Sequence, residues 1–230
     1  MFDFWLSFAD NTLSSTNGDS VRRASIVLAL VLLSAVAGRA AVRVSIMAGY
    51  AAATQWSSAH DFGISAAAEL DLTNFLAVGA RLTRSSVPIP AGASSGAELG
   101  QGRLTMVPVA LFLQFQWPGA GRLKPYLAAG GGYSFNSHAL APEAADAWDL
   151  VGFSAEETIA NTTVAFAGAG FDLALGSRLF FNVHAQIVVA PLSGTWTLTD
   201  SVTGLKATGD LSGSNGLNSI VAGIGLKYQF

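Results

Sequence analysis

The residues best suited to chemistry are charged and polar side chains that recur at every second position of otherwise apolar segments. They are Arg43, Glu69, Arg81, Gln114, Gln116, Asp172, Asn182, His184, Lys227 and Gln229. Because side chains alternate between the two faces of a β-strand, each of these residues lies opposite an apolar face. Enclosed together, they would either line a narrow wet path or pair as a plug. We expect the plug, with Arg81 bound to Glu69, since an unpaired charge away from water is costly.

Catalytic and metal chemistry have weaker support in the sequence. His60, His138 and His184 lie in separate segments without a second His at ligand spacing, and the chain contains no cysteine. We therefore predict no metal and no other cofactor. A lipid-modifying serine-type site would need Ser, His and a carboxylate that converge on a lipid-facing surface. His184 falls on the opposite face, so we predict that the protein is not an enzyme and keep the lipid-modifying enzyme as an alternative.

The composition restricts the class of protein. Of the 230 residues, 51% are hydrophobic and 12% are charged, and the net charge is −3. This charged fraction is about half of that in soluble domains. A net negative charge gives no electrostatic case for binding nucleic acid. The 25 glycines, with frequent Ser, Thr and Phe, favour strands and turns.

The N-terminal region has the three-part form of a secretory signal. An apolar run over residues 24–38 follows Arg22 and Arg23 and ends in small residues. We predict a signal peptide over residues 1–40 with an over-long start, cleaved after Ala40, and a single domain over residues 41–230. The alternative is an N-terminal anchor that stays attached.

Alternating apolar segments continue from residue 42 to the C-terminus. The clearest case is the hairpin over residues 104–135, where the odd positions are apolar and the even positions become polar or small. Period-two alternation indicates strands. The predicted strands cover residues 42–50, 64–72, 76–83, 107–117, 127–135, 162–175, 179–189 and 220–230.

The connections between these strands alternate between short and long. The short turns are 71–75, 117–124 and 175–179, whereas 51–60 is of middling length and 84–103, 136–161 and 191–218 are long. This asymmetry is typical of outer-membrane barrels, whereas a soluble two-sheet sandwich would have similar turns at both ends. We therefore predict an all-β protein, an eight-stranded antiparallel transmembrane β-barrel. Aromatic residues near the strand ends would form two interfacial girdles: Tyr50, Trp117, Tyr126, Tyr133, Phe171, Tyr228 and Phe230.

The segment 136–161 carries five acidic residues and no Lys or Arg. It could gather divalent cations near lipopolysaccharide or contact a partner. We expect instead a solvated amphipathic loop with a helical turn over residues 142–151.

The hairpin resembles the OmpW family of small outer-membrane barrels. The match consists of a Pro-bearing apolar strand followed by an aromatic, Gly-rich strand: Pro108, Gln114, Phe115, Pro125, Tyr126, Gly130, Gly132, Tyr133 and Phe135. The terminal YQF, with Tyr228 and Phe230, looks like the signal read by the outer-membrane assembly machinery. The resemblance implies the outer membrane of a Gram-negative bacterium, contact with its lipids and lipopolysaccharide, and either passage of small apolar molecules or a receptor role.

Pro108 lies within an otherwise regular strand and has no backbone N–H to donate. We expect the barrel wall to bulge or part there, with room left by Gly130, Gly131 and Gly132 on the next strand. Met106 and Phe112 would line an apolar route that opens sideways into lipid at this seam. The alternative is that Pro108 only marks a bulge or an early strand end.

Overall fold

The computed structural model describes residues 41–53, 60–89, 101–117, 121–212 and 217–230. The predicted signal peptide over residues 1–40 lies outside this part of the chain. None of the helices in the described part is both long enough and apolar enough to cross a membrane.

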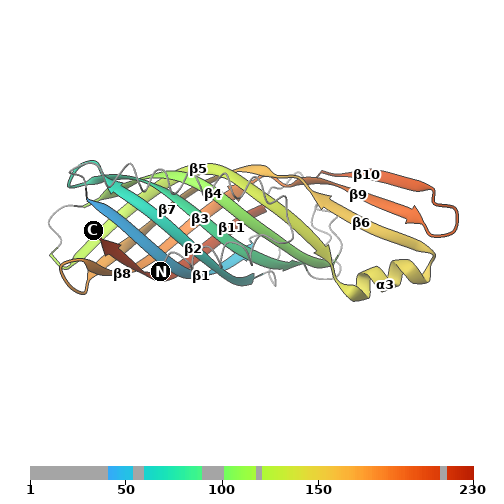
Figure 1. Cartoon of the computed structure of the whole chain (residues 1–230), viewed down its shortest axis with the longest axis horizontal. Helices are drawn as coiled ribbons and strands as arrows, with labels where there is room; N and C mark the ends of the chain where they lie inside the picture. The colour runs from blue at the N-terminus through green and yellow to red at the C-terminus, as the bar shows by residue number, and fades with distance from the viewer. Residues whose placement is uncertain (1–40, 54–59, 90–100, 118–120, 213–216) are drawn as a thin grey trace.

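Eight strands close into an antiparallel barrel in the order β1-β11-β8-β7-β5-β4-β3-β2, which confirms the predicted fold (Figure 1). Chain neighbours pair throughout, and β1 closes the barrel against β11. The strands are β1 (Val42–Ala53), β2 (His60–Asp71), β3 (Leu76–Ile89), β4 (Gly102–Gln116), β5 (Leu123–Leu140), β7 (Thr162–Ala174), β8 (Leu179–Ala190) and β11 (Leu217–Gln229).

The barrel wall is apolar outside and polar inside. Leu111 on β4 is 64% exposed, while its strand neighbours Ala110 and Phe112 are buried in the interior. Other apolar residues of the outer face are also exposed: Ile46, Ile64, Leu113, Leu127, Ile187, Val189, Ile220, Ile224 and Leu226. Exposed Leu and Ile around a closed barrel form the band that contacts lipid, and closure pairs every strand edge.

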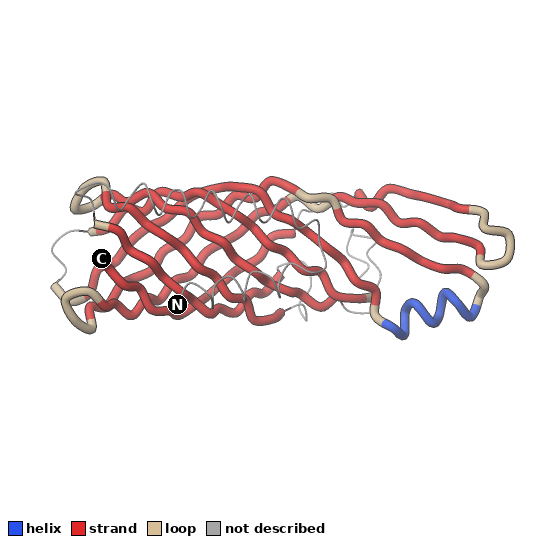
Figure 2. The backbone as a smooth tube through the Cα atoms, viewed as in Figure 1, coloured by secondary structure: helices blue, strands red, loops and turns tan. Residues whose placement is uncertain are grey.

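The two ends of the barrel differ. The short turns between β2 and β3 and between β7 and β8 lie at one end of the barrel (Figure 2). Both ends of the described part of the chain lie there too, since the carbonyl of Ala41 accepts from Asp71 and that of Val42 from Phe230. We call this the short-turn end and the opposite one the long-loop end. At the long-loop end the strands run on into segments predicted to be loops, so β3 reaches Ile89 and β5 reaches Leu140.

Three further strands and one helix extend beyond the long-loop end (Figure 1). The helix α3 (Pro142–Leu150) begins with Pro142 in its first turn, which confirms the predicted helical turn. The strands β6 (Phe153–Ile159), β9 (Ser193–Asp200) and β10 (Lys206–Ser212) form a separate sheet in the order β10-β9-β6. The prediction of loops was therefore wrong for these segments. The alternation of apolar and polar residues in β6 and β9 is too weak to identify either strand from the sequence of that strand alone.

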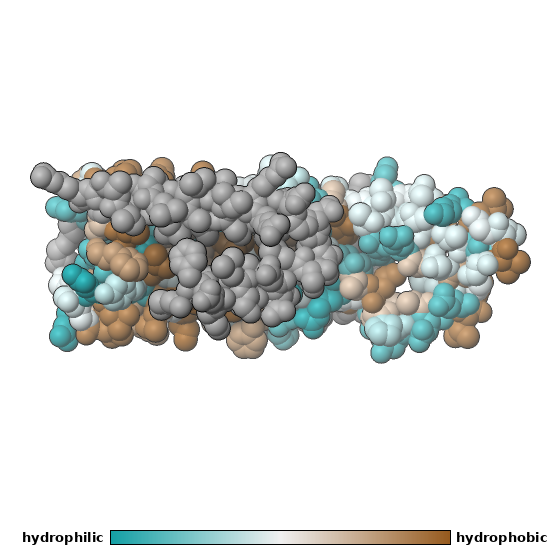
Figure 3. Space-filling model, viewed as in Figure 1, coloured by the Kyte–Doolittle hydropathy of each residue, from teal (hydrophilic) through white to brown (hydrophobic). Residues whose placement is uncertain are grey.

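The turn between β9 and β10 is held by Asp200. One of its carboxylate oxygens accepts hydrogen bonds from the backbone N–H groups of Val202 and Thr203, both at 2.8 Å. These bonds lower the pKa of Asp200, since they favour its charged form. This turn forms a tip of the extension, and its apolar residues Val202 and Leu205 are exposed. Figure 3 shows apolar residues, in brown, at the far end of the extension.

Most of the predicted girdle aromatics lie on the outer face. Exposed aromatics include Tyr50 and Tyr133 towards the long-loop end, and Trp117, Tyr228 and Phe230 at the short-turn end. The prediction that Tyr126 belongs to a girdle was wrong, because this residue is only 4% exposed and its side chain lies inside the barrel. It occupies an even position of β5, and the neighbouring odd residues face lipid, so strand alternation requires the inward direction.

Candidate functional site in the barrel interior

A layer of paired charges crosses the barrel near the short-turn end. The ammonium of Lys227 lies 3.0 Å from Oε1 of Glu69 and 3.0 Å from Oδ2 of Asp172. Arg43 contacts Asp71 and lies 3.4 Å from Glu69 and 3.6 Å from Asp172. Lys227 is 2% exposed and Asp172 1% exposed. Water therefore does not reach the centre of this layer, which we call the charged layer.

Polar side chains complete the charged layer. Gln116 donates to Asp172 at 3.1 Å and accepts from Arg43 at 3.3 Å. Asn182 donates to Asp172 at 2.6 Å and to the hydroxyl of Tyr126 at 3.0 Å. The contributing strands are β1, β2, β4, β5, β7, β8 and β11. An eight-stranded interior is just wide enough for side chains to fill it, so this layer occupies the cross-section.

The predicted pair of Arg81 with Glu69 is wrong. Glu69 is held by Lys227 and Arg43, and its neighbour across β3 is Gly79, so Arg81 sits one level further along the barrel. The guanidinium of Arg81 donates instead to Oε1 of Gln186 at 2.6 Å. Strand alternation gave the inward direction of both residues. The stagger of the barrel, which alternation does not encode, sets their levels.

Arg81 belongs to an aromatic layer above the charged layer. Its guanidinium lies 5.0 Å from the ring centroid of Phe112 and 5.3 Å from that of Phe166, at cation–π distance. The two rings are 6.3 Å apart. Phe166 and Gln186 were not among the predicted site residues. Their inward positions follow from the alternation of β7 and β8, which is the signal that could have identified them.

The remaining predicted interior residues lie at different levels. Gln114 is buried, and its Nε2 atom has no hydrogen-bond partner in the described structure. His184 is also buried and lies next to the cavity described below, and its Nδ1 atom likewise has no partner there. Gln229 is half-buried near the short-turn end.

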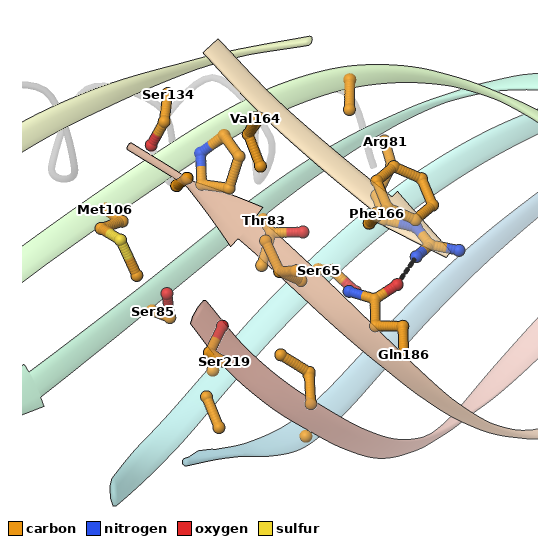
Figure 4. A pocket seen from close by; sticks show the side chains of 18 of the residues that line it. Ser65, Arg81, Thr83, Ser85, Met106, Ser134, Val164, Phe166, Gln186 and Ser219 are labelled. Atoms are coloured by element: carbon orange, nitrogen blue, oxygen red, sulfur yellow. Dashed lines mark hydrogen bonds between the residues drawn. The ribbon is translucent and has the colours of Figure 1, made fainter. Parts of the chain in front are cut away.

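A cavity of about 50 Å³ lies above the aromatic layer (Figure 4). Met106, Pro108 and Ser134 line it from β4 and β5. The hydroxyl-bearing residues Ser65, Thr83, Ser85 and Ser219 line it from β2, β3 and β11, and Arg81, Phe166 and Gln186 bound it towards the aromatic layer. A space of this size has room for roughly three or four water molecules. It can therefore hold only a small ligand.

An apolar cluster borders the cavity on its other side, and Met106 belongs to both. Val87, Ile89 and Leu104 are almost fully buried, and Ile159 of β6 packs with them. Trp196 of β9 covers the cluster from the extension. The described residues thus bound the cavity below by the aromatic layer and above by this apolar cap.

The wall beside the cavity is interrupted between β3 and β4. Leu82 pairs with Val109 and Ser85 pairs with Met106, but the two residue pairs between them, which include Pro108, are missing from this ladder. The register is the same on both sides, so the ladder skips these two pairs without the inserted residue that defines a bulge. We call this interruption the seam. Pro108 lacks an N–H to donate across it.

Two details of the predicted seam need correction. Phe112 lies in the aromatic layer and is not among the residues that line the cavity, whereas Met106 and Pro108 are. The glycines of β5 leave no room, because a Cβ on Gly132 would come within 1.9 Å of the carbonyl oxygen of Val109. Pairing of β4 with β5 continues through Pro108 and Ser134. The seam therefore lies on the β3 side of Pro108.

Among the described residues, no group of three or more His, Asp or Glu side chains is arranged to hold a metal ion.

The closed wall, the lipid-facing apolar band and the polar interior define the class: a small transmembrane β-barrel of the outer-membrane type. No family model matches the sequence, and no curated protein matches it. Among solved structures, the chain is similar to the outer membrane protein OprG from Pseudomonas aeruginosa, at 15% identity and a TM-score of 0.57, over 83% of this chain and 95% of that one.

Two further solved structures share the fold. Neisserial surface protein A (NspA) has 12% identity and a TM-score of 0.53, over 83% of this chain and 97% of its own. A major outer membrane protein from Thermus thermophilus has 16% identity and a TM-score of 0.53, over 82% of this chain and 99% of its own. Similarity at these identities is a similarity of fold.

Proposed function

We propose that this protein is an outer-membrane barrel of a Gram-negative bacterium that passes small hydrophobic molecules sideways through the seam. The observation that carries the proposal is the coincidence of the seam with the cavity, since Pro108 belongs to both. The charged layer supports a sideways route, because a path along the barrel axis would have to cross paired and buried charges. The sequence resemblance to the OmpW family agrees with this role.

In this proposal the short-turn end faces the periplasm and the long-loop end faces outwards. The cavity then lies in the outer half of the membrane, and its ligand passes between the cavity and the surrounding lipid. An unmatched carbonyl in lipid is costly, so the proposed route opens at the seam. We assign no catalytic role, because His184 lies inside the barrel and no described hydroxyl or carboxylate bonds its Nδ1 atom.

The test is Pro108→Ala, which restores a backbone N–H and allows β3 and β4 to pair across the seam. In proteoliposomes with a lipopolysaccharide outer leaflet, we expect the variant to take up toluene several-fold more slowly than the wild type. The new backbone amide at position 108 should be protected from deuterium exchange in the variant, because it can donate to a carbonyl of β3.

Pro125→Ala is the matched control, since Pro125 also lies in a barrel strand but near the short-turn end, away from the cavity. It should leave uptake unchanged. Both variants should keep the heat-resistant migration of a folded barrel. Equal toluene uptake by wild type and Pro108→Ala, with the amide at position 108 protected in the variant, would refute the lateral route.

A receptor role is a second candidate, favoured by the tip of the extension. Val202 is 90% exposed and Leu150 87% exposed, and Leu205 and Val151 are also open. Exposed apolar residues at the end of a projecting element are typical of a contact surface. Deletion of the β9–β10 turn should abolish partner binding without affecting toluene uptake if both roles exist.

A further inference from the structure

Arg81 is a buried cation without a matching anion. It forms no ion pair with any described residue, and the carboxylates of the charged layer are held by Arg43 and Lys227. Gln186 accepts a hydrogen bond from the guanidinium of Arg81. The Nε atom of Arg81 has no hydrogen-bond partner among the described residues. Because a buried charge without a counter-charge is costly, an anion bound beside Arg81 would be favoured.

The cavity next to Arg81 supplies the rest of a binding site. The cavity is lined by hydroxyl groups that can donate to an anionic oxygen: Ser65, Thr83, Ser85 and Ser219. Apolar atoms of Met106, Pro108 and Val188 line it as well. A planar guanidinium matches a carboxylate with two parallel hydrogen bonds, and small apolar walls match a short alkyl chain.

We propose that the cavity binds a short-chain aliphatic carboxylate, with the carboxylate on Arg81 and the alkyl tail towards Met106 and Pro108. The volume of about 50 Å³ suits an acid of a few carbons. This inference goes beyond the proposed lateral route and does not depend on it, because an ionised carboxylate is excluded from the lipid into which that route opens.

The test is equilibrium binding of sodium butyrate to the refolded full chain in detergent, measured by calorimetry beside acetate and 1-butanol. We expect affinity to rise by up to about fourfold for each methylene from acetate to butyrate, as the tail is buried. The neutral alcohol should bind at least tenfold more weakly than butyrate. Arg81→Met should lower butyrate affinity at least tenfold, and Arg81→Lys should restore part of it.

Arg84→Met is the matched control, because it removes the same charge from the same strand on the outer face, and its butyrate affinity should equal the wild-type value. Met fits between Phe112 and Phe166, so Arg81→Met should keep its heat-resistant migration. A second variant, Ser85→Leu, fills the cavity while retaining Arg81 and should also abolish binding.

Butyrate binding that is absent from the wild type, or unchanged in Arg81→Met and Ser85→Leu, would overturn the inference. Equal affinities for acetate and butyrate would overturn the apolar part of the site. Normal butyrate binding together with unaltered toluene uptake by Pro108→Ala would support this site and reject the lateral route, so the two proposals fail separately.

Discussion

At the scale of single residues, the interior separates two cations that the sequence pattern treats alike. Lys227 lies between Glu69 and Asp172, at 3.0 Å from each, whereas Arg81 has an amide and two aromatic rings as its neighbours. Both are buried. A buried ion pair is expensive to break, because removal of one partner leaves the other as an uncompensated charge.

We therefore predict that Lys227→Met costs about 3–5 kcal/mol of unfolding free energy. The double variant with Glu69→Gln should cost less than the sum of the two single changes, since it removes a charge of each sign. Urea unfolding of the refolded barrel in detergent, analysed as a double-mutant cycle, measures the coupling. Strictly additive losses would contradict the direct pairing of these two side chains.

At the scale of elements, close strand contact at β4 and β5 depends on glycine. A Cβ on Gly132 would lie 1.9 Å from the carbonyl oxygen of Val109 and 2.5 Å from the Cα atom of Ala110, both backbone atoms that cannot turn aside. The tight β4–β5 contact and the interrupted β3–β4 ladder therefore lie on opposite sides of the same segment of β4. The interruption is thus confined to the β3 side of Pro108.

Gly132→Ala should separate β4 from β5 and lower barrel stability by roughly 2 kcal/mol or more, in the range of overpacked cores. Gly176→Ala is the control, because an added Cβ there would meet no atom within 4 Å. Thermal unfolding followed by gel migration distinguishes the two variants. Equal unfolding temperatures of the two variants would show that β4 and β5 can accommodate an added methyl group at Gly132.

At the scale of the whole molecule, assembly has to place a polar interior inside an apolar wall. The last strand closes the barrel against β1, and the backbone N–H of Phe230 donates to the carbonyl of Val42 at 2.9 Å. The rings of Tyr228 and Phe230 meet edge to face on the outer surface, at a centroid distance of 5.0 Å. Phe230 is 70% exposed, so its contribution to the packing of the finished barrel is small.

Deletion of Phe230 should therefore lower the amount of protein in the outer membrane while the molecules that assemble keep their wild-type unfolding temperature. Immunoblots of membrane and periplasmic fractions measure the first effect, and the heat-modified gel shift measures the second. Val202→Ser, a change at the exposed tip, controls for general effects on expression. Wild-type membrane levels of the deletion variant would exclude an assembly role for this residue.

Much of the fold could be predicted from the sequence, because alternation with a period of two residues assigns each residue of a strand to one face of the sheet. In β4, for example, it places Leu111 towards lipid and Phe112 towards the interior. The short turns gave the pairing order of neighbouring strands. The sheet of β6, β9 and β10 escaped prediction, since its strands carry few apolar residues and are defined by their mutual pairing.

The sequence alone determined which side chains point into the barrel, and it did so for Arg43, Glu69, Arg81 and Lys227 alike. Only the tertiary structure decided which of them meet. Barrel closure staggers each strand against the next, and this stagger puts Lys227 beside Glu69 and Asp172 while Arg81 rises to the aromatic layer. Alternation is a property of one strand, but level along the axis is a property of the closed sheet, and for that reason the cavity and its unpaired cation were visible only in the folded barrel.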